Sequence, residues 1–297
     1  MNRQLFRTIG SGSQLSFLAL FFFSGLILTG IVSALYLALS GQHDIYSLSP
    51  NILKFIQTIQ AVFVFLVPAW LCAYLFHESP KQYLTIHSRF SIGQVLIVSG
   101  IMISLLPFIN WVGYFNSQMV LPETLSGLEA QIKEAEMNAG KLTERLLLSN
   151  SIIDFISSLA VIAFVAAITE EFFFRGVLQQ ILAKSTRNIH LAVWITAIVF
   201  SAIHFQFYGF LPRMLLGAVM GYVFVWTGSI WMAVLAHFVN NACAVISHYL
   251  YAGTSTYDRF EKLGTNGTWP FALAGFLTAL LLIVLLRRTT RGFQSRQ

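Results

Sequence analysis

The chain has 297 residues, of which 56% are hydrophobic and only 10% are charged, and its net charge is +6. A soluble domain carries about 25% charged residues, so this composition excludes an ordinary soluble protein. We expect an all-α, polytopic protein of the lipid bilayer, and its basic residues favour membrane orientation over nucleic-acid binding because most lie beside apolar runs.

Eight apolar segments are long enough to be membrane helices. Two arginines precede the first, whose length favours an uncleaved anchor over a signal peptide. Pro68 is expected to kink the second segment, and the fourth is long enough to project from the apolar core or bend near Gly176. The predicted segments are 17–39, 56–76, 92–109, 152–182, 191–207, 211–226, 230–249 and 271–286.

A polar interval, 110–150, separates the third and fourth apolar segments. Between Glu123 and Leu148, leucine and isoleucine recur at i, i+3 and i+4 on a charged background. This spacing predicts an amphipathic helix, or a helical pair interrupted near Gly140. The interval is expected on the external side, where it lies on the membrane, covers the site or acts as a solvated connector.

An even number of spans places both termini on one side of the membrane. With Arg175 set aside, ten of the remaining Lys and Arg residues fall on the terminal side and seven on the other. Because cytoplasmic loops are enriched in basic residues, both termini are expected in the cytoplasm. The ten are Arg3, Arg7, Lys81, Arg89, Lys184, Arg187, Arg287, Arg288, Arg291 and Arg296.

The fourth segment carries three ionisable residues, Glu170, Glu171 and Arg175. An ionised group at membrane depth costs roughly 2.5–3.5 kcal/mol, so such groups need partners or a wet cavity. Glu171 and Arg175 are four residues apart on one helical face and can pair. Glu170 is rotated by about 100° from Glu171 and is left free as a base, acid or ligand. The alternative is a helix-end charge cluster at the membrane surface.

Three later polar residues strengthen the functional interpretation of Glu170. His204 lies in the fifth segment, while His237 and Asn241 share one face of the seventh. A lone intramembrane histidine is more often a packing residue. A carboxylate, two imidazoles and an amide on neighbouring helices can instead activate water and stabilise an oxyanion. Glu170, or Glu171, with His204 and His237 also matches a catalytic zinc ligand set.

These residues stand in three ordered motifs, Glu170-Glu171-x-x-x-Arg175, Phe200-x-x-x-His204 and His237-x-x-x-Asn241. The motifs resemble those of the CPBP family, the CAAX prenyl protease and bacteriocin-processing (Abi) intramembrane proteases. The resemblance covers about 152–249. It implies an eight-helix fold with a cavity open to the cytoplasm, in which Glu170 and His204 activate water and His237 and Asn241 stabilise the oxyanion. Glu171 and Arg175 match a supporting ion pair, and the family is described both as metalloprotease and as metal-free.

The resulting hypothesis is a multi-pass endopeptidase of the bacterial inner membrane that cleaves a membrane-associated protein or peptide. It uses either no cofactor or Zn²⁺, and the sequence specifies no oligomeric state. A non-catalytic scaffold or bacteriocin self-immunity protein is the first alternative, and a proton-coupled transporter is the second. The predicted organisation is 1–150, three helices and the external segment; 151–250, the catalytic core; and 251–297, the last helix and a basic cytoplasmic tail.

Overall fold

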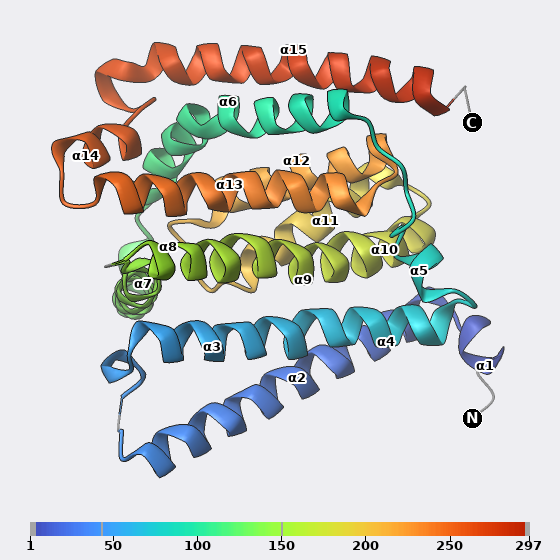
Figure 1. The fold of residues 1–297 in the computed structure, drawn as a ribbon, viewed down its shortest axis with the longest axis horizontal. Coiled ribbons are helices and arrows are strands. Elements are labelled where there is room, and N and C mark those ends of the chain that lie inside the picture. The colour runs from blue at the N-terminus through green and yellow to red at the C-terminus, as the bar shows by residue number, and fades with distance from the viewer. Residues whose placement is uncertain (1–3, 43, 150, 295–297) are drawn as a thin grey trace.

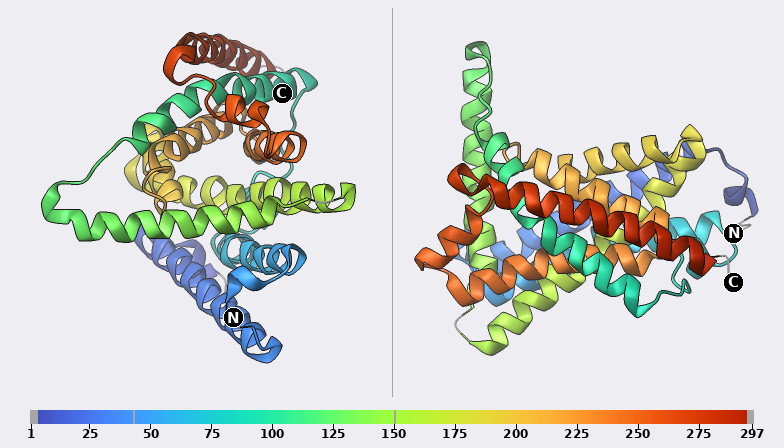
Figure 2. Two further views of the ribbon diagram at one scale, coloured as in Figure 1. Left: turned by 90° about the vertical axis from the view of Figure 1, so that its left-hand side faces the viewer. Right: turned by 90° about the horizontal axis from the view of Figure 1, so that it is seen from above.

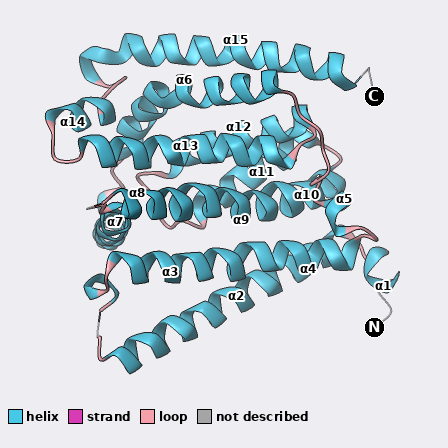
Figure 3. Ribbon diagram, viewed as in Figure 1, coloured by secondary structure: helices cyan, strands magenta, loops and turns pink. Residues whose placement is uncertain are grey.

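The computed structural model describes residues 4–42, 44–149 and 151–294, and every regular element in these ranges is helical. Arg3, Asn150 and Arg296, which the predictions above include, lie outside them. Seven of the described helices are long and apolar enough to cross a membrane, and α11 (Ile189–Ala202) is a shorter apolar helix. The predicted all-α, polytopic fold with about eight membrane helices is therefore confirmed (Figures 1 and 3).

The membrane-crossing helices lie roughly along one direction, with both ends of the described chain at the same end of the bundle (Figure 1). We call this the terminal end. The opposite end carries α7 (Ser126–Leu147), which lies across the direction of the bundle (Figure 2). Besides α7 and α11, the described α-helices outside the fourth span are α1 (Gln4–Arg7), α2 (Ser11–Ser40), α3 (Pro50–Ala61), α4 (Val67–Phe76), α5 (Pro80–Tyr83), α6 (Ile92–Ser117), α12 (Phe210–Thr227), α13 (Ile230–Tyr251), α14 (Ser255–Glu261) and α15 (Trp269–Gln294).

Two spans contain π-helical stretches. In the second span, η2 (Val62–Leu66) joins α3 to α4 just before Pro68, which has no N–H to donate to the helix. The fourth span runs unbroken over 35 residues, Ile152–Thr186. It consists of α8 (Ile152–Ser158), η4 (Leu159–Val165), α9 (Ala166–Phe173), η5 (Phe174–Leu178) and α10 (Gln179–Thr186). The irregularity expected at Gly176 is thus a π-helical stretch inside one long helix.

The polar interval differs from its prediction in two ways. The third span continues as helix to Ser117, so the start of the interval belongs to α6. The remaining part contains a single α7 that passes through Gly140 without a break, so the helical pair was wrong. A glycine inside a helix lowers its stability by only about 1 kcal/mol relative to alanine, so the helix can continue through Gly140 when the residues on both sides are helical.

Helices α11 and α12 pack closely because α12 presents two glycines to its neighbours. A methyl group at Gly217 would lie 3.1 Å from Phe200 Cδ1 and 3.3 Å from Ala197 Cα. At Gly221 it would lie 3.0 Å from Val193 Cγ1. The missing side chains let the two backbones approach, as small residues do between membrane helices. This contact places the end of α11 beside the middle of the bundle.

Candidate active site

The ion pair between Glu171 and Arg175 lies fully buried in the fourth span. Arg175 Nη1 is 2.6 Å from Glu171 Oε1, and both side chains are 0% exposed. Arg175 also donates from Nη2 to the carbonyl oxygen of Gly217, at 2.6 Å, and its guanidinium lies over the Phe200 ring. Each charge therefore has an opposite charge or a polar partner at close range, as burial requires.

His237 is held by the same carboxylate. Its Nδ1 is 2.9 Å from Glu171 Oε1, and because a carboxylate accepts hydrogen bonds, Nδ1 carries the proton. In the neutral ring Nε2 is then the free nitrogen, and it lies 4.0 Å from Glu170 Oε2. The sequence analysis grouped His237 with Glu170 and did not foresee the bond to Glu171. Glu171 thus positions both Arg175 and His237.

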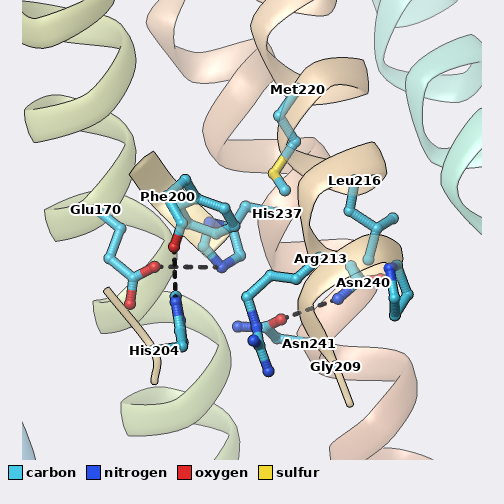
Figure 4. Close-up of a pocket in the computed structure, with 11 residues that line it drawn as sticks. Glu170, Phe200, His204, Gly209, Arg213, Leu216, Met220, His237, Asn240 and Asn241 are labelled. Atoms are coloured by element: carbon cyan, nitrogen blue, oxygen red, sulfur yellow. Dashed lines mark hydrogen bonds and ion pairs between the residues drawn. The ribbon is translucent and has the colours of Figure 1, made fainter. Parts of the chain in front are cut away.

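Glu170 immediately precedes Glu171 in the helix, and its side chain lines a cavity of about 270 Å³. Its side chain is 13% exposed, and its Oε2 is buried without a hydrogen-bond partner in the structure. Figure 4 shows its carboxylate facing the same space as His204 and His237. A carboxylate with an unsatisfied oxygen in a cavity can accept a proton from bound water.

His204 lies outside the helix in which the sequence analysis placed it. Helix α11 ends at Ala202, and His204 follows in the connection 203–209, before Phe205 with a left-handed φ of 52°. Its Nδ1 is 2.8 Å from the carbonyl oxygen of Phe200, so Nδ1 donates and Nε2 is free in the neutral ring. The turn carries the ring into the cavity wall (Figure 4).

Asn241 lines the cavity as well, together with Asn240, which the sequence analysis did not select. Asn241 Nδ2 donates to the carbonyl oxygen of Ile162 at 3.0 Å, and its Oδ1 accepts from Asn240 Nδ2 at 3.1 Å. An amide nitrogen has two hydrogens, so one N–H of Asn241 remains for a ligand. Asn240 is a neighbour that fixes the orientation of this amide.

Arg213 is a further cavity residue that the sequence analysis assigned only to the topology count. Its Nη2 donates to Gln206 Oε1 at 2.5 Å, while Nη1 is buried without a partner. A charge within an apolar segment, the same signal that marked Glu170, could have identified it. Gln179, in contrast, is buried and donates to the carbonyl oxygen of Gly221, and its polar neighbours gave no signal of this burial.

The predicted zinc ligands do not converge as a metal-binding group. Among the described residues, no three His, Cys, Asp or Glu side chains are grouped so that they could hold a metal ion. His237 already donates from Nδ1 to Glu171, and its Nε2 is 4.0 Å from the Glu170 carboxylate. Glu170, His204 and His237 therefore do not form a zinc site in this arrangement, and the zinc-dependent alternative stays a prediction.

The cavity lies towards the α7 end of the bundle. Its wall includes Gly209 and Pro212 at the α11–α12 connection, where Tyr208 contacts Glu129 and Glu136 of α7. The expectations of cytoplasmic termini and a cavity open to the cytoplasm require both features at one end. Both ends of the described chain lie at the terminal end (Figure 1), whereas the connection 203–209, which carries His204, contacts α7 at the other end. Both expectations stay predictions.

Comparisons with known proteins find that part of the chain is similar to a family of proteases. Residues 152–243 match the family described as type II CAAX prenyl endopeptidase Rce1-like, and this segment contains every predicted site residue. The uncharacterized protein YpbD of Bacillus subtilis (strain 168) is 30% identical over 80 residues, which cover 26% of this chain and 38% of that protein. The alignment thus spans less than half of the curated relative. No solved structure is significantly similar.

Proposed function

We propose, from the premise that residues 152–243 belong to the Rce1-like CAAX prenyl endopeptidase family, that this protein hydrolyses peptide bonds within the membrane. The observation that carries the proposal is the contrast between two adjacent carboxylates. Glu171 is bonded through Oε1 to Arg175 and His237 and lies away from the cavity, whereas the Glu170 carboxylate lines the cavity and accepts no hydrogen bond from any described residue. One carboxylate builds the site, and the other is free for chemistry.

Glu170 acts as the general base. It takes a proton from a water molecule while the water oxygen attacks the carbonyl carbon of the scissile bond. The gap of 4.0 Å between Glu170 Oε2 and His237 Nε2 exceeds a direct hydrogen bond and suits a bridging water. The second hydrogen of this water is donated to a free imidazole nitrogen, either His237 Nε2 or His204 Nε2, and the two rings are alternative acceptors for it.

The tetrahedral intermediate carries its negative charge on the former carbonyl oxygen. The remaining N–H of Asn241 is the donor for this oxyanion, because its other N–H is committed to Ile162. When the intermediate collapses, Glu170 returns its proton to the leaving amine, so that one water is consumed and one peptide bond is broken. The enzyme ends in its starting protonation state.

The test is cleavage of a quenched fluorescent peptide library by the purified, full-length protein, compared with Glu170→Gln and with Glu134→Gln on the exposed face of α7. General base catalysis contributes about 10²–10⁴-fold, so Glu170→Gln should lose at least 100-fold in rate, while Glu134→Gln should match the parent. Equal cleavage by the parent and Glu170→Gln would refute the proposal.

Metal dependence is measured on the same preparation. Activity that survives washing with chelator, with no metal bound in proportion to protein, is expected for the glutamate mechanism. About one zinc per chain, lost and regained together with activity, would replace it by the zinc-dependent alternative.

A further inference from the structure

We infer that the cavity receives its substrate from the side of the membrane opposite to the termini, and that this side is extracytoplasmic. On the endopeptidase function proposed above, on which this inference rests, the substrate class is an extended extracytoplasmic segment of a polypeptide. Cytoplasmic prenylated proteins would then not reach the site.

The burial of side chains along α12 shows which end of the cavity is closed. This helix begins at the α7 end and runs towards the terminal end (Figure 1). Its first cavity residues, Pro212 and Arg213, are partly exposed, whereas Leu216 and Met220, farther along, are 9% and 1% exposed. The cavity therefore closes towards the termini.

Burial along α13, which runs antiparallel to α12, also shows that the cavity is closed towards the termini. It begins at the terminal end and finishes near α14, which lies at the α7 end (Figure 1). Its first cavity residue, His237, is 4% exposed, whereas Asn240 and Asn241, farther from the termini, are partly exposed. Two antiparallel helices thus agree that the opening faces α7.

Helix α7 is attached beside this opening. Tyr208, in the same connection as His204, donates from its backbone N–H to Glu136 Oε2 at 3.3 Å and from its hydroxyl to Glu129 Oε1 at 3.4 Å. Lys133 pairs with Glu129 at 2.8 Å on the outer side of this contact. Helix α7 lies across the bundle at this end and so borders the path of any segment that enters the cavity (Figure 2).

The basic residues assign the two ends to compartments. Short connections at the terminal end carry Lys81, Arg89 and Arg187, and Lys184 lies just before the last of these. At the α7 end, the connections 41–49 and 203–209 carry no Lys or Arg, whereas the longer connections that contain α7 and α14 carry Lys133, Lys141, Arg145, Arg259 and Lys262. Because cytoplasmic segments are enriched in basic residues and ten of the seventeen Lys and Arg residues counted in the sequence fall on the terminal side, this end is cytoplasmic and the cavity opens outside.

The size of the cavity limits the form of the substrate. A volume of about 270 Å³ holds a few side chains, whereas an α-helix with its side chains is about 10–12 Å wide. The substrate must therefore enter as an extended segment. The unpartnered Nη1 of Arg213, in the wall nearest the opening, can receive a carbonyl or carboxylate oxygen of that segment.

The compartment is tested by labelling of single cysteines with a membrane-impermeant maleimide in intact bacterial cells. Cys72 and Cys243 are first replaced by Ala, and Cys is then introduced at one of three positions: Glu134 on α7, Pro212 at the cavity opening, or Ser185 on α10. We expect the first two to be labelled in intact cells and Ser185→Cys only after permeabilisation. Labelling of Pro212→Cys only after permeabilisation, together with Ser185→Cys, would overturn the inference.

The substrate class is tested with sealed membrane vesicles of the two orientations and a membrane-impermeant quenched peptide library. Right-side-out vesicles should cleave the peptides at least 10-fold faster than inside-out vesicles, and detergent should remove the difference. Faster cleavage by inside-out vesicles would overturn the inference while leaving the endopeptidase function intact. No cleavage in detergent would instead contradict the endopeptidase function, and the labelling result would still decide the compartment.

Discussion

Glu170 and Glu171 are adjacent in the chain, yet their surroundings differ in kind. Glu171 is 0% exposed and shares one oxygen with Arg175 and His237, at 2.6 and 2.9 Å. Glu170 lies at the edge of a cavity, 4.0 Å from the other nitrogen of the same imidazole. One helical step of about 100° thus separates a structural carboxylate from one that can meet water.

Replacement of Glu171 should damage the fold, whereas replacement of Glu170 should damage activity alone. Glu171→Ala leaves the buried guanidinium of Arg175 without its anion, and breaking a buried pair costs roughly 3–5 kcal/mol. Thermal unfolding in detergent should show a large loss of stability for Glu171→Ala and little change for Glu170→Gln. The assignment is reversed if Glu170→Gln unfolds while Glu171→Gln remains folded but inactive.

At the scale of the element, α12 organises the site through its backbone. The carbonyl oxygens of Gly217 and Gly221, four residues apart, accept from Arg175 and Gln179, which are also four residues apart. The absence of side chains at both glycines lets the fourth span and α12 form this pair of contacts. The two helices are thereby fixed in register around the cavity.

Gly221→Ala should therefore destabilise the protein. The added methyl would lie 2.8 Å from Gln179 Oε1 and 3.0 Å from Val193 Cγ1, so the bond to the Gly221 carbonyl would have to shift. Overpacking of this kind typically costs about 1–3 kcal/mol.

The matched control is Gly30→Ala in α2, where a methyl would meet nothing within 4 Å. Alanine is favoured over glycine inside a helix by roughly 0.5–1 kcal/mol, so the control should hold or gain stability in thermal unfolding. Equal stability of the two variants would contradict the close contact at Gly221.

The contact between α7 and the connection 203–209 should depend on pH. A hydrogen bond from Lys133 lowers the pKa of Glu129, and the Glu129 carboxylate accepts from Tyr208. Because the folded-state pKa lies below the ordinary value, the contribution of Glu129 to stability is complete above pH 4.5 and is lost as pH falls through the folded-state pKa. Hydrogen exchange of 203–209 should accelerate over that lower range.

The variant Glu129→Gln supplies the control for this contact. It should show faster exchange of 203–209 already at neutral pH and little further change on acidification, because no carboxylate remains to titrate. An unchanged pH response in Glu129→Gln would show that another group controls the connection.

At the scale of the whole molecule, the cavity and the outer helices have separate roles. All residues that line the cavity fall between Glu170 and Asn241, and the family match covers the same region. Helix α15 packs on α6, away from the cavity, and Gly275 lies where a side chain would overlap the carbonyl oxygen of Ser104 (Figure 1). This pair therefore supports the bundle without lining the cavity.

Gly275→Leu should weaken the attachment of α15, while Ala274→Leu, on the exposed side of the same helix, should be tolerated. We expect lower thermal stability and yield for Gly275→Leu, with an unchanged KM for peptide cleavage in the fraction that remains folded. A changed KM with unchanged stability would show that α15 communicates with the cavity.

The sequence by itself determined the class of fold, the apolar segments and the pairing of Arg175 with Glu171. Each of these depends on residues close in the chain, because hydropathy and the 3.6-residue helical period act locally. The ordered motifs also led to the resemblance to the CPBP family, and residues 152–243 match the family described as Rce1-like CAAX prenyl endopeptidase. The catalytic roles, the division into regions, the membrane orientation and the metal state stay predictions.

Only the tertiary structure decided which groups meet across the bundle. His237 reaches Glu171 over 66 residues, Arg213 and Asn240 join the cavity wall, and His204 enters from a turn. The end of the bundle at which the cavity opens likewise follows from the packing of α12 against α11 and α13. Local sequence spacing cannot fix these features, because helix register and depth are set by close contacts between segments distant in the chain.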